Sequence, residues 1–335
     1  MDNVSIINDV VDAAFSDSDE LIVRAFEFNK DRKNELLFFF KPECFLSGSP
    51  ENAGRIVEMV FDKFSRYKTE VSGALLLRGN RLDELSIMDR HYGFINKLSR
   101  NASGMVGEEE LSKIRDSLDT GGSGDCRVLG GHEFLERFGG FDEKSLDDLW
   151  LTKKSVKLRS GFYVQKYNVN GEDIILVNGF HPAQLRHFTD PTHRIVVLLL
   201  HSDADWKGLK HGMVGDTFPE KAEKDSIRGE LFSNSAAYGI PEVSISNNCV
   251  HLSAGPFEAL FEMDNFLKDI QGVAFDLKKT NMYRLMTGRG LAAGDVERCI
   301  QNPVTQINGK STDLFTLTED RDSEDAVSDF IRYFT

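Results

Sequence analysis

Apolar residues in the first hundred positions group into strand-like runs separated by stretches of helix-like spacing. Residues 35–40, ELLFFF, form a nearly continuous apolar run of strand length, and residues 71–79, VSGALLLRG, have the same character. Residues 53–67 and 81–98 instead repeat apolar positions every three or four residues, which is the spacing of one helix face. Strands and helices that alternate along the chain favour an α/β sandwich.

The middle of the chain changes character. Residues 99–130 are polar and rich in glycine, so we expect a loop there, with SLDTGGSGD (117–125) as its clearest part. Residues 161–177 follow as two β-rich runs around Asn170-Gly171, a pair suited to a type I′ turn. The second pattern predicts a β-hairpin.

The last part of the chain returns to strand and helix signals. The apolar run 193–202 predicts a buried strand, and the alternation at 243–246 predicts a half-buried one. Pro256 suits the first turn of a helix. Beyond residue 270 we expect little organisation until a final helix, capped by Asp322 or Ser323. That helix should pack four apolar residues: Ala326, Val327, Phe330 and Ile331.

Composition and charge limit the function classes. The 335 residues are 40% hydrophobic, with mean hydropathy −0.32 and no apolar run near the length of a membrane span, so we expect a soluble protein without a membrane partner. The net charge of −14 argues against nucleic acid, because phosphate backbones favour Lys- and Arg-rich surfaces. A few cations focused in a cleft can still bind a small anion. Four widely spaced cysteines without a CxxC pair favour a reducing compartment, and we expect the cytoplasm.

Three short segments carry side chains suited to phosphate. Lys41 directly follows the run 35–40, where α/β folds place ligand sites. His91-Tyr92 lies near the end of the second predicted helix. Residues 208–231 combine glycines with a hydroxyl and basic side chains: Lys210, His211, Thr217 and Arg228. Taken singly, each segment is more often a solvated loop or a packing position.

The segment NNCVHLSAGPFEALFEM (247–263) has the most explicit chemistry. His251 lies at the end of a strand-like run, and a small-residue turn leads into a helix that carries Glu262. A histidine oriented by a carboxylate is suited to act as a nucleophile or a general base. A lone histidine in a strand is more often structural.

In their order along the chain, these segments resemble the nucleoside diphosphate kinase family. Its motifs read here as KPE (41–43), HY (91–92), GDTFP (215–219), IRGEL (227–231) and NCVH (248–251). The resemblance implies an α/β (α+β) fold, a ferredoxin-like sandwich with an antiparallel sheet, plus an inserted α/β segment with a β-hairpin. It also implies a transferase that moves the γ-phosphate of ATP, or of another nucleoside triphosphate, to a nucleoside diphosphate through a phosphohistidine.

The same resemblance implies roles for single residues. His251 would be the nucleophile, Glu262 and Ser253 would hold its imidazole, and Lys41 and Tyr92 would lie near the transferred phosphoryl group. The remaining matches would bind the nucleotide: Lys210, His211, Thr217 and Arg228 at the phosphates, and Asn248 at the sugar. Mg²⁺ would be held mainly by the nucleotide's phosphates, with no protein metal site. Nucleoside di- and triphosphates would be the partners, and a homo-oligomer is left open.

Several positions depart from the family pattern. His211 stands where the family has a second phosphate-binding arginine, and Glu43 replaces an aspartate. Losing a forked cation weakens phosphate binding by about 1–3 kcal/mol, unless the neighbouring Lys210 compensates. Between Arg228 and His251 the chain is longer by about ten residues, a length typical of an inserted loop.

We therefore expect a family-like core at 35–100 and 180–268, interrupted by an insertion at 101–179. Residues 1–34 would form an N-terminal extension and 269–335 a C-terminal one. Two alternatives to an active kinase stay open. One is a catalytically weak nucleotide-binding regulatory protein on the same fold. The other is a related enzyme whose phosphohistidine discharges to water or to a non-nucleotide acceptor.

Overall fold

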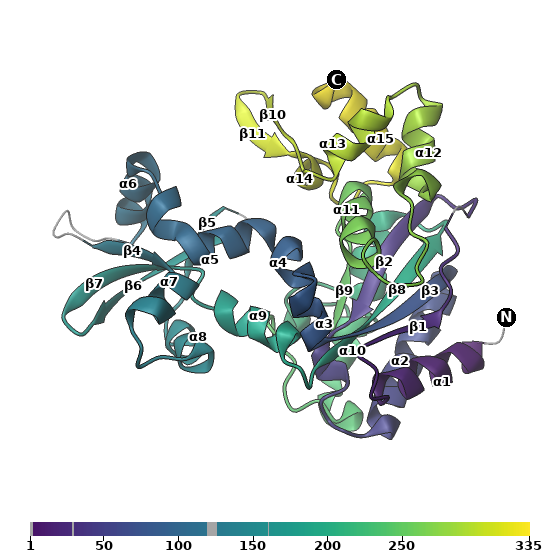
Figure 1. Ribbon diagram of the computed structural model, residues 1–335, viewed down its shortest axis with the longest axis horizontal. Helices are drawn as coiled ribbons and strands as arrows, with labels where there is room; N and C mark the ends of the chain where they lie inside the picture. Colours follow the sequence, from purple (N-terminus) through teal and green to yellow (C-terminus); the bar gives the residue numbers. More distant parts are fainter. Residues whose placement is uncertain (1–2, 29, 119–125, 160) are drawn as a thin grey trace. The chain divides into compact units, whose positions relative to one another are not determined.

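The computed structural model describes residues 3–28, 30–118, 126–159 and 161–335 (Figure 1). The chain forms two compact units, which are described one at a time. The first unit combines Met1–Leu85 with Pro191–Thr335, and the second is Ser86–Asp190. The second unit is thus wider than the expected insertion at 101–179, since it also includes residues 86–98, most of the second predicted helix, and residues 180–190.

The first unit is built on a five-stranded sheet in the order β1-β3-β8-β2-β9, in which every neighbouring pair is antiparallel. The chain is a mixed α/β protein with antiparallel sheets, as predicted. The strands are β1 (Glu20–Arg24), β2 (Asn34–Phe40), β3 (Thr69–Arg78), β8 (Arg194–Ser202) and β9 (Val250–Leu252).

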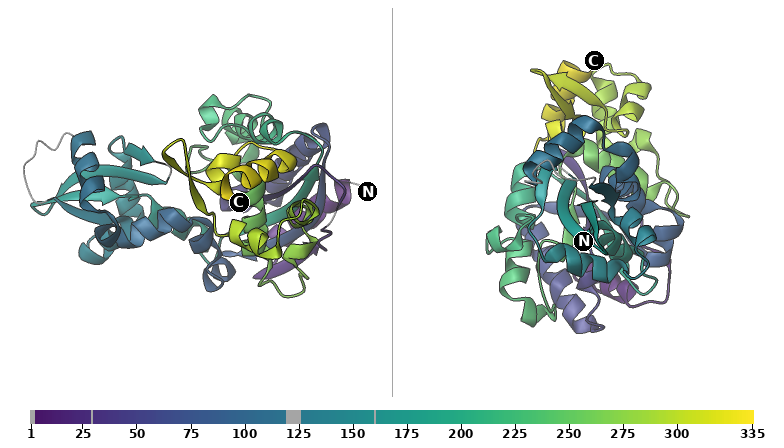
Figure 2. Two further views of the ribbon diagram at one scale, coloured as in Figure 1. Left: turned by 90° about the horizontal axis from the view of Figure 1, so that it is seen from above. Right: turned by 90° about the vertical axis from the view of Figure 1, so that its left-hand side faces the viewer.

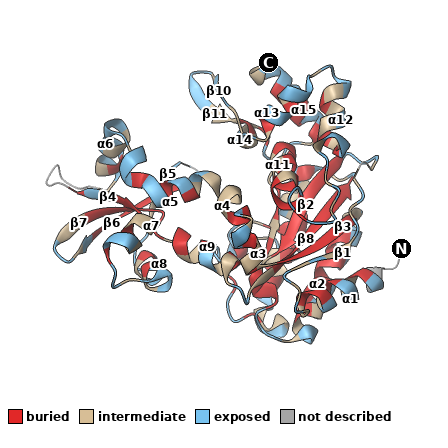
Figure 3. Cartoon of the chain, viewed as in Figure 1, coloured by how far each residue is buried: buried red, intermediate tan, exposed pale blue. Residues whose placement is uncertain are grey.

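Strand β2 is buried along its whole length because both faces of the sheet are covered (Figure 3). Leu36, Phe38 and Phe40 point into the core formed with α1, α2 and α10, while Phe39 lies against Phe266 of α11 at a ring distance of 5.5 Å. Figures 1 and 2 show α1 and α2 on one side of this sheet and α11 on the other. A strand buried on both faces needs no polar alternation, which explains the run ELLFFF.

Helices and short turns connect these strands. The larger ones are α1 (Asn3–Ala14), α2 (Pro50–Arg66), α3 (Gly79–Glu84), α10 (Ile227–Ser233) and α11 (Pro256–Leu267). Single turns lie at η1 (Pro42–Cys44), η3 (Pro219–Lys221) and η4 (Ser235–Tyr238), and η2 (Gly208–Val214) is a π-helical turn. Helix α2 starts after Ser49, whose hydroxyl accepts a hydrogen bond from the amide of Asn52. Its first residue is a proline, and the missing N–H breaks no helical hydrogen bond at that position.

The chain after α11 is organised rather than irregular, which corrects the expectation for residues beyond 270. It forms η5 (Leu277–Lys279), α12 (Asn281–Gly288), α13 (Ala293–Cys299), the hairpin β10 (Val304–Ile307) and β11 (Lys310–Asp313), α14 (Leu314–Thr318) and α15 (Ser323–Phe334). Helices α12, α13 and α14 have only 8, 7 and 5 residues, so each shows little of an apolar repeat in the sequence. They are stabilised by packing of residues such as Met282, Met286 and Val296 against neighbouring elements. In α15, Ala326, Val327 and Phe330 are buried as predicted, but Ile331 is exposed.

Polar side chains of the sheet fasten this C-terminal region to the first unit. Asp322 Oδ1 accepts hydrogen bonds from Asn34 Nδ2 and from the amide of Trp206, both at 2.8 Å. Glu35 Oε2 accepts one from the amide of Asn281 at 2.8 Å, while Glu35 Oε1 meets His201 Nε2 at 3.0 Å. Of the two residues predicted to cap α15, Asp322 occupies the N-cap position. Its carboxylate makes no capping hydrogen bond to the helix and forms the bonds above instead.

The second unit has its own mixed sheet in the order β4-β7-β6-β5, with β4 parallel to β7 and the other pairs antiparallel. Its strands are β4 (Arg127–Gly130), β5 (Val156–Arg159), β6 (Phe162–Val169) and β7 (Glu172–Val177). Its helices are α4 (Ile87–His91), α5 (Gly93–Met105), α6 (Glu108–Ser117), α7 (Gly131–Arg137), α8 (Glu143–Leu151) and α9 (His181–Thr189). The predicted hairpin is confirmed as β6 and β7, with positive φ at Asn170 (54°) and Gly171 (83°).

Three local expectations are wrong. Most of the predicted loop at 99–130 is helix and strand, because α6 needs little more than Ile114 to anchor it in the second unit's core. The clearest loop residues, 119–125, lie outside the described residues. The predicted helix 81–98 is interrupted at Ser86, which adopts φ 50°. Residues 243–246 form no strand, since Ser244 and Asn247 bond to each other in a tight loop and Ile245 is exposed.

In the described part of the chain, the helices are all too short or too polar to cross a membrane.

Asp322 should carry much of the attachment of the C-terminal region. The change Asp322→Ala removes the acceptor of two part-buried donors, so we expect the free energy of unfolding to fall by about 1–3 kcal/mol. Denaturant unfolding measures this, with the exposed Glu297→Ala as control. Equal unfolding midpoints for the two variants would contradict the assignment.

Candidate active site

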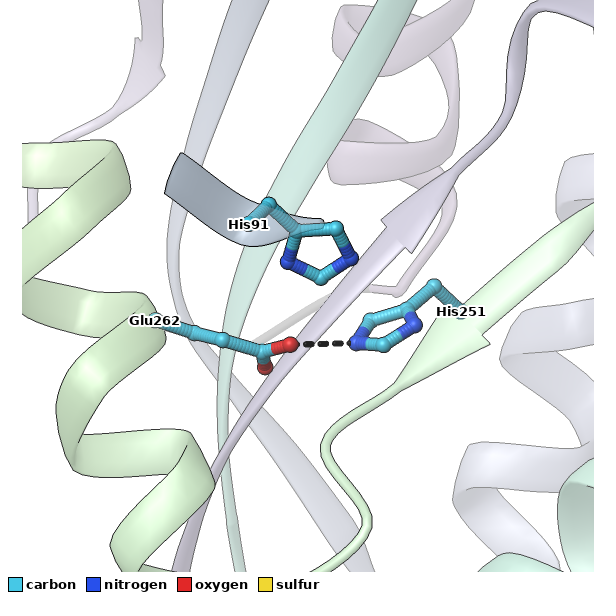
Figure 4. A group of neighbouring side chains, drawn as sticks. All are labelled: His91, His251 and Glu262. Carbon is cyan, nitrogen blue, oxygen red and sulfur yellow. Dashed lines mark hydrogen bonds and ion pairs between the residues drawn. The ribbon is translucent and has the colours of Figure 1, made fainter. Parts of the chain in front are cut away.

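The centre of the candidate site is a histidine–glutamate pair. His251 lies on β9, opposite Phe39 of β2, and its Nε2 meets Oε1 of Glu262 at 2.6 Å (Figure 4). The Glu262 side chain is fully buried, whereas 19% of the His251 side chain is exposed. After β9 the chain turns at 253–255 and returns as α11, so the second turn of that helix brings Glu262 back beside His251. The predicted pair is therefore in contact.

Ser253 holds the other oxygen of the same carboxylate. Its Oγ lies 2.5 Å from Glu262 Oε2 and also within hydrogen-bond distance of both the amide and the carbonyl of Leu37, at 3.1 and 3.0 Å. A buried carboxylate is costly unless its oxygens are hydrogen-bonded. Ser253 thus fixes Glu262 against β2, and Glu262 fixes the imidazole.

The plane of the imidazole is set by an aromatic neighbour. The rings of Phe39 and His251 stack with centroids 4.5 Å apart and planes 18° apart. Phe266 of α11 packs on Phe39 in turn. The histidine is thus constrained by a hydrogen bond at its edge and by a stacked ring on its face.

Two cations lie beside His251. Lys41 donates from its backbone amide to the carbonyl of Cys249 at 2.8 Å, and from its Nζ to Asn248 Oδ1 at 2.6 Å. Arg228 donates to the carbonyls of Gly215 at 3.1 Å and Val250 at 2.9 Å. In the part of the chain that the structure describes, neither cation has a carboxylate within ion-pair distance. Both charges are therefore available to an anion.

These surroundings favour neutral imidazole. Burial lowers the pKa of His251 well below its usual value, and the charges of Lys41 and Arg228 lower it further. Burial also lowers the pKa of Arg228 to about 10, and it lowers the pKa of Lys41. A neutral imidazole with an oriented N–H is the reactive form for nucleophilic attack.

The loop before His251 holds a strained residue. Cys249 adopts φ 69°, which is uncommon for a residue other than glycine. Its amide donates to Glu43 Oε1 at 2.7 Å, and its carbonyl accepts from the amide of Lys41 and from Cys44 Sγ at 3.1 Å. Sequence reasoning noted Glu43 only as a departure from a motif, yet its buried carboxylate maintains the backbone that leads into His251.

The other predicted phosphate ligands are bonded to different parts of the chain. Lys210 and His211 stand on η2 and contact acidic residues of the C-terminal region. Thr217 is exposed, and its carbonyl accepts a long 3.4 Å bond from Asn248 Nδ2. The side-chain amide of Asn248 thus accepts a hydrogen bond from Lys41 through Oδ1 and donates to backbone carbonyls through Nδ2, so it points into the cluster.

Tyr92 belongs to the second compact unit, just before α5. Its ring lies against His181 and Phe188 of the same unit, with centroids 5.5 and 6.0 Å apart. His91, which Figure 4 also draws, belongs to that unit as well. The role expected for Tyr92 stays a prediction.

One residue of the site was not anticipated at all. Glu258 lies one turn before Glu262 on α11 and accepts a hydrogen bond from the amide of Ala254 at 3.0 Å. Burial, reinforced by the charge of Glu262, raises the pKa of Glu258 to about 8. Nothing in the sequence signals this, because the effect depends on two carboxylates meeting on one buried helix face.

The described residues of the first unit bring no three histidine, cysteine or acidic side chains together as a metal site would. Two buried carboxylates near His251 are already engaged: Glu262 by His251 and Ser253, and Glu43 by the amide of Cys249.

No protein-family model matches the chain, and no curated protein matches it. Among solved structures, a nucleoside diphosphate kinase from Encephalitozoon cuniculi aligns with 13% identity and a TM-score of 0.33, over 72% of this chain and 94% of that one. An NDP kinase from Pyrobaculum aerophilum aligns with 16% identity and a TM-score of 0.34, over 70% and 96%. Values this low carry no conclusion about activity.

The raised pKa of Glu258 predicts a pH-dependent stability. Between about pH 4.5 and 8 the folded chain binds more protons at Glu258 than the unfolded chain, so stability falls as pH rises through this window. In Glu258→Gln this loss should be absent, so the variant gains on the wild type from pH 5 to pH 8. Urea unfolding at several pH values measures the difference, and parallel pH profiles would refute it.

Proposed function

We propose that this chain is a phosphotransferase of nucleoside diphosphate kinase type, which passes the γ-phosphate of a nucleoside triphosphate through His251 to a nucleoside diphosphate. The observation that carries the proposal is a stacked histidine, hydrogen-bonded to a buried glutamate, beside two cations that have no carboxylate within ion-pair distance among the described residues. Phosphoryl transfer depends chiefly on positioning and on stabilising phosphate charge, and this cluster supplies both.

The hydrogen bond assigns the ring nitrogens. A neutral imidazole has one N–H and one lone pair, and Glu262 as an ionised acceptor takes the N–H of Nε2. Nδ1 then carries the lone pair and attacks the γ-phosphorus. The N–P bond forms as the bond to the bridging oxygen breaks, and the diphosphate leaves with that electron pair. In the second half, an oxygen of the acceptor diphosphate attacks phosphorus and the N–P bond breaks, which restores the imidazole.

The neighbouring groups have separate tasks. Lys41 and Arg228 offset the negative charge that develops on the transferred phosphoryl group and the leaving diphosphate. Asn248 holds Lys41 in this position, and its expected contact with the sugar would need one of its present bonds to open. Mg²⁺ bound to the nucleotide's phosphates would add charge neutralisation, which fits a site whose nearby carboxylates are engaged.

The topology of the first unit supports the ferredoxin-like part of the proposal. Leaving out the edge strand β1, the elements run β2-α2-β3, then β8-α10-β9, and the sheet order is β3-β8-β2-β9. This is the split βαβ arrangement, in which each of two βαβ units has a strand of the other between its own two. This arrangement accounts for the proximity of Lys41, Arg228 and His251. Lys41 follows β2, His251 lies on the neighbouring strand β9, and Arg228 lies on α10, the helix that precedes β9.

The regulatory alternative keeps one supporting observation. Lys210 and His211, which the family resemblance places at the phosphates, are engaged by carboxylates of the same chain. A protein that binds nucleotide weakly and exchanges phosphate slowly would also look like this. The third reading, discharge of the phosphohistidine to water, has no such observation in its favour.

Radiolabelling tests the proposal directly. With Mg²⁺ and γ-³²P-ATP, the wild type should acquire acid-labile label, His251→Ala should acquire none, and added GDP should remove the label. The control His187→Gln, a histidine of α9, should label normally. An unlabelled wild type would refute the proposal, and label that GDP does not remove would favour the third reading.

The depressed pKa of His251 gives a second test. Because the folded-state pKa lies below 6.5, the imidazole should stay neutral, and labelling should keep its rate, as pH falls from 8 past 6.5. Lys41→Ala removes one nearby charge and should raise the pKa of His251, whereas the exposed Lys310→Ala should not. NMR titration of the His251 ring measures both. An unchanged pKa in Lys41→Ala would count against the arrangement.

A further inference from the structure

The C-terminal region places two acidic side chains on the basic residues of η2. Lys210 Nζ forms ion pairs with Glu319 and with Asp320 Oδ1, the latter at 3.0 Å. His211 Nε2 meets Asp320 Oδ2 at 2.9 Å. The acids lie about 110 residues further along the chain, so sequence patterns do not connect the two pairs.

The backbone of residues 318–320, which carry these acids, packs against the turn that follows Ser253. The amide of Asp320 donates to the carbonyl of Ala254 at 3.0 Å, and a Cβ on Gly255 would come within 2.5 Å of the Thr318 carbonyl oxygen. Burial tends to raise the pKa of Asp320, but the bonds from His211 and Lys210 outweigh it and lower the pKa. Asp320 is therefore an ionised, anchored part of the structure beside the candidate site.

Glu319 differs from Asp320 in its exposure to solvent. Half of its side chain is exposed (50%), against 31% for Asp320 and 19% for Lys210. An exposed ion pair is worth at most about 1 kcal/mol, so a stronger acceptor can displace Glu319 at small cost. A phosphate oxygen is such an acceptor, since it brings more charge than a carboxylate to the same ammonium group.

Lys210 differs from Lys41 and Arg228 in having carboxylate partners within the chain. Lys41 and Arg228 lie beside His251 and have no carboxylate within ion-pair distance among the described residues, whereas Lys210 and His211 contact Glu319 and Asp320 of the same chain. A ligand's phosphates thus meet two cations without an ion pair and a third, Lys210, that is already paired. Because Glu319 is tethered to the site, it competes at a high effective concentration.

We propose that Glu319 is an internal competitor for the phosphate-binding charge of Lys210, and that Asp320 is the anchor that keeps it there. The proposal rests on the function proposed above and adds a regulation of the same site: binding of a polyphosphate requires Lys210 to exchange Glu319 for a phosphate oxygen. The C-terminal region therefore sets how tightly the site binds its ligand.

Calorimetric binding of ADP and of inorganic tripolyphosphate tests this exchange. We expect Glu319→Gln to bind both about two- to fivefold more tightly than the wild type at low salt, with the gain shrinking at high salt as surface pairs are screened. Glu297→Gln is the matched control: it makes the same charge change on an exposed position of α13 and should leave affinity unchanged. In a Lys210→Ala background, Glu319→Gln should have no effect.

Each other outcome counts against the exchange. Equal affinities for Glu319→Gln and Glu297→Gln, a gain that survives Lys210→Ala, or no measurable polyphosphate binding by either Glu319→Gln or the wild type would overturn it. The labelling of His251 is measured separately on the same proteins. Tighter binding without labelling would leave the exchange standing and remove the kinase, and labelling without tighter binding would do the reverse.

Discussion

The hydrogen bond between His251 and Glu262 is the constraint on which the candidate site depends. A fully buried carboxylate is tolerated only when its oxygens are bonded, and here one oxygen meets the imidazole and the other meets Ser253. Because Ser253 is itself bonded to the backbone of Leu37, strand β2 fixes the positions of these three side chains. The stacked ring of Phe39 comes from the same strand.

Hydrogen bonds also fix the backbone at Cys249, two residues before His251. The left-handed conformation of Cys249 costs free energy, and the bonds that offset it come from Glu43 and Lys41, just beyond the end of β2. The departure from a familiar motif at Glu43 therefore has a structural meaning, since its carboxylate reaches the amide of Cys249. The same turn delivers the lysine that lowers the pKa of the histidine.

The basic residues assigned to this site fall into two groups with different partners. Lys41 and Arg228 are close enough to His251 to lower its pKa, while Lys210 and His211 are engaged by Glu319 and Asp320. The protein is acidic overall, yet it places Lys41 and Arg228 together beside His251, while its C-terminal region forms ion pairs with Lys210. Under the proposed function, that division separates the cations used at the reacting phosphorus from those that adjust binding.

The sequence by itself determined the elements whose burial is written in their pattern. The run ELLFFF, the Asn170-Gly171 hairpin and the helix after Pro256 follow from local rules, and the spacing of His251, Ser253 and Glu262 across a strand, turn and helix does too. The sequence pattern predicted too little structure at α6, whose buried residue is Ile114, and beyond residue 270, where the helices are short. It also predicted a strand at 243–246, where Ile245 is exposed.

Tertiary structure alone decided the state of the charged groups. Whether Lys210 is available, whether Glu258 is protonated and which ring nitrogen of His251 is engaged depend on contacts between residues far apart in sequence or on opposite elements. Burial and Coulomb interactions act through distance in space, and a one-dimensional pattern does not contain that distance. The sequence thus names the side chains at the site, and the fold sets their charges.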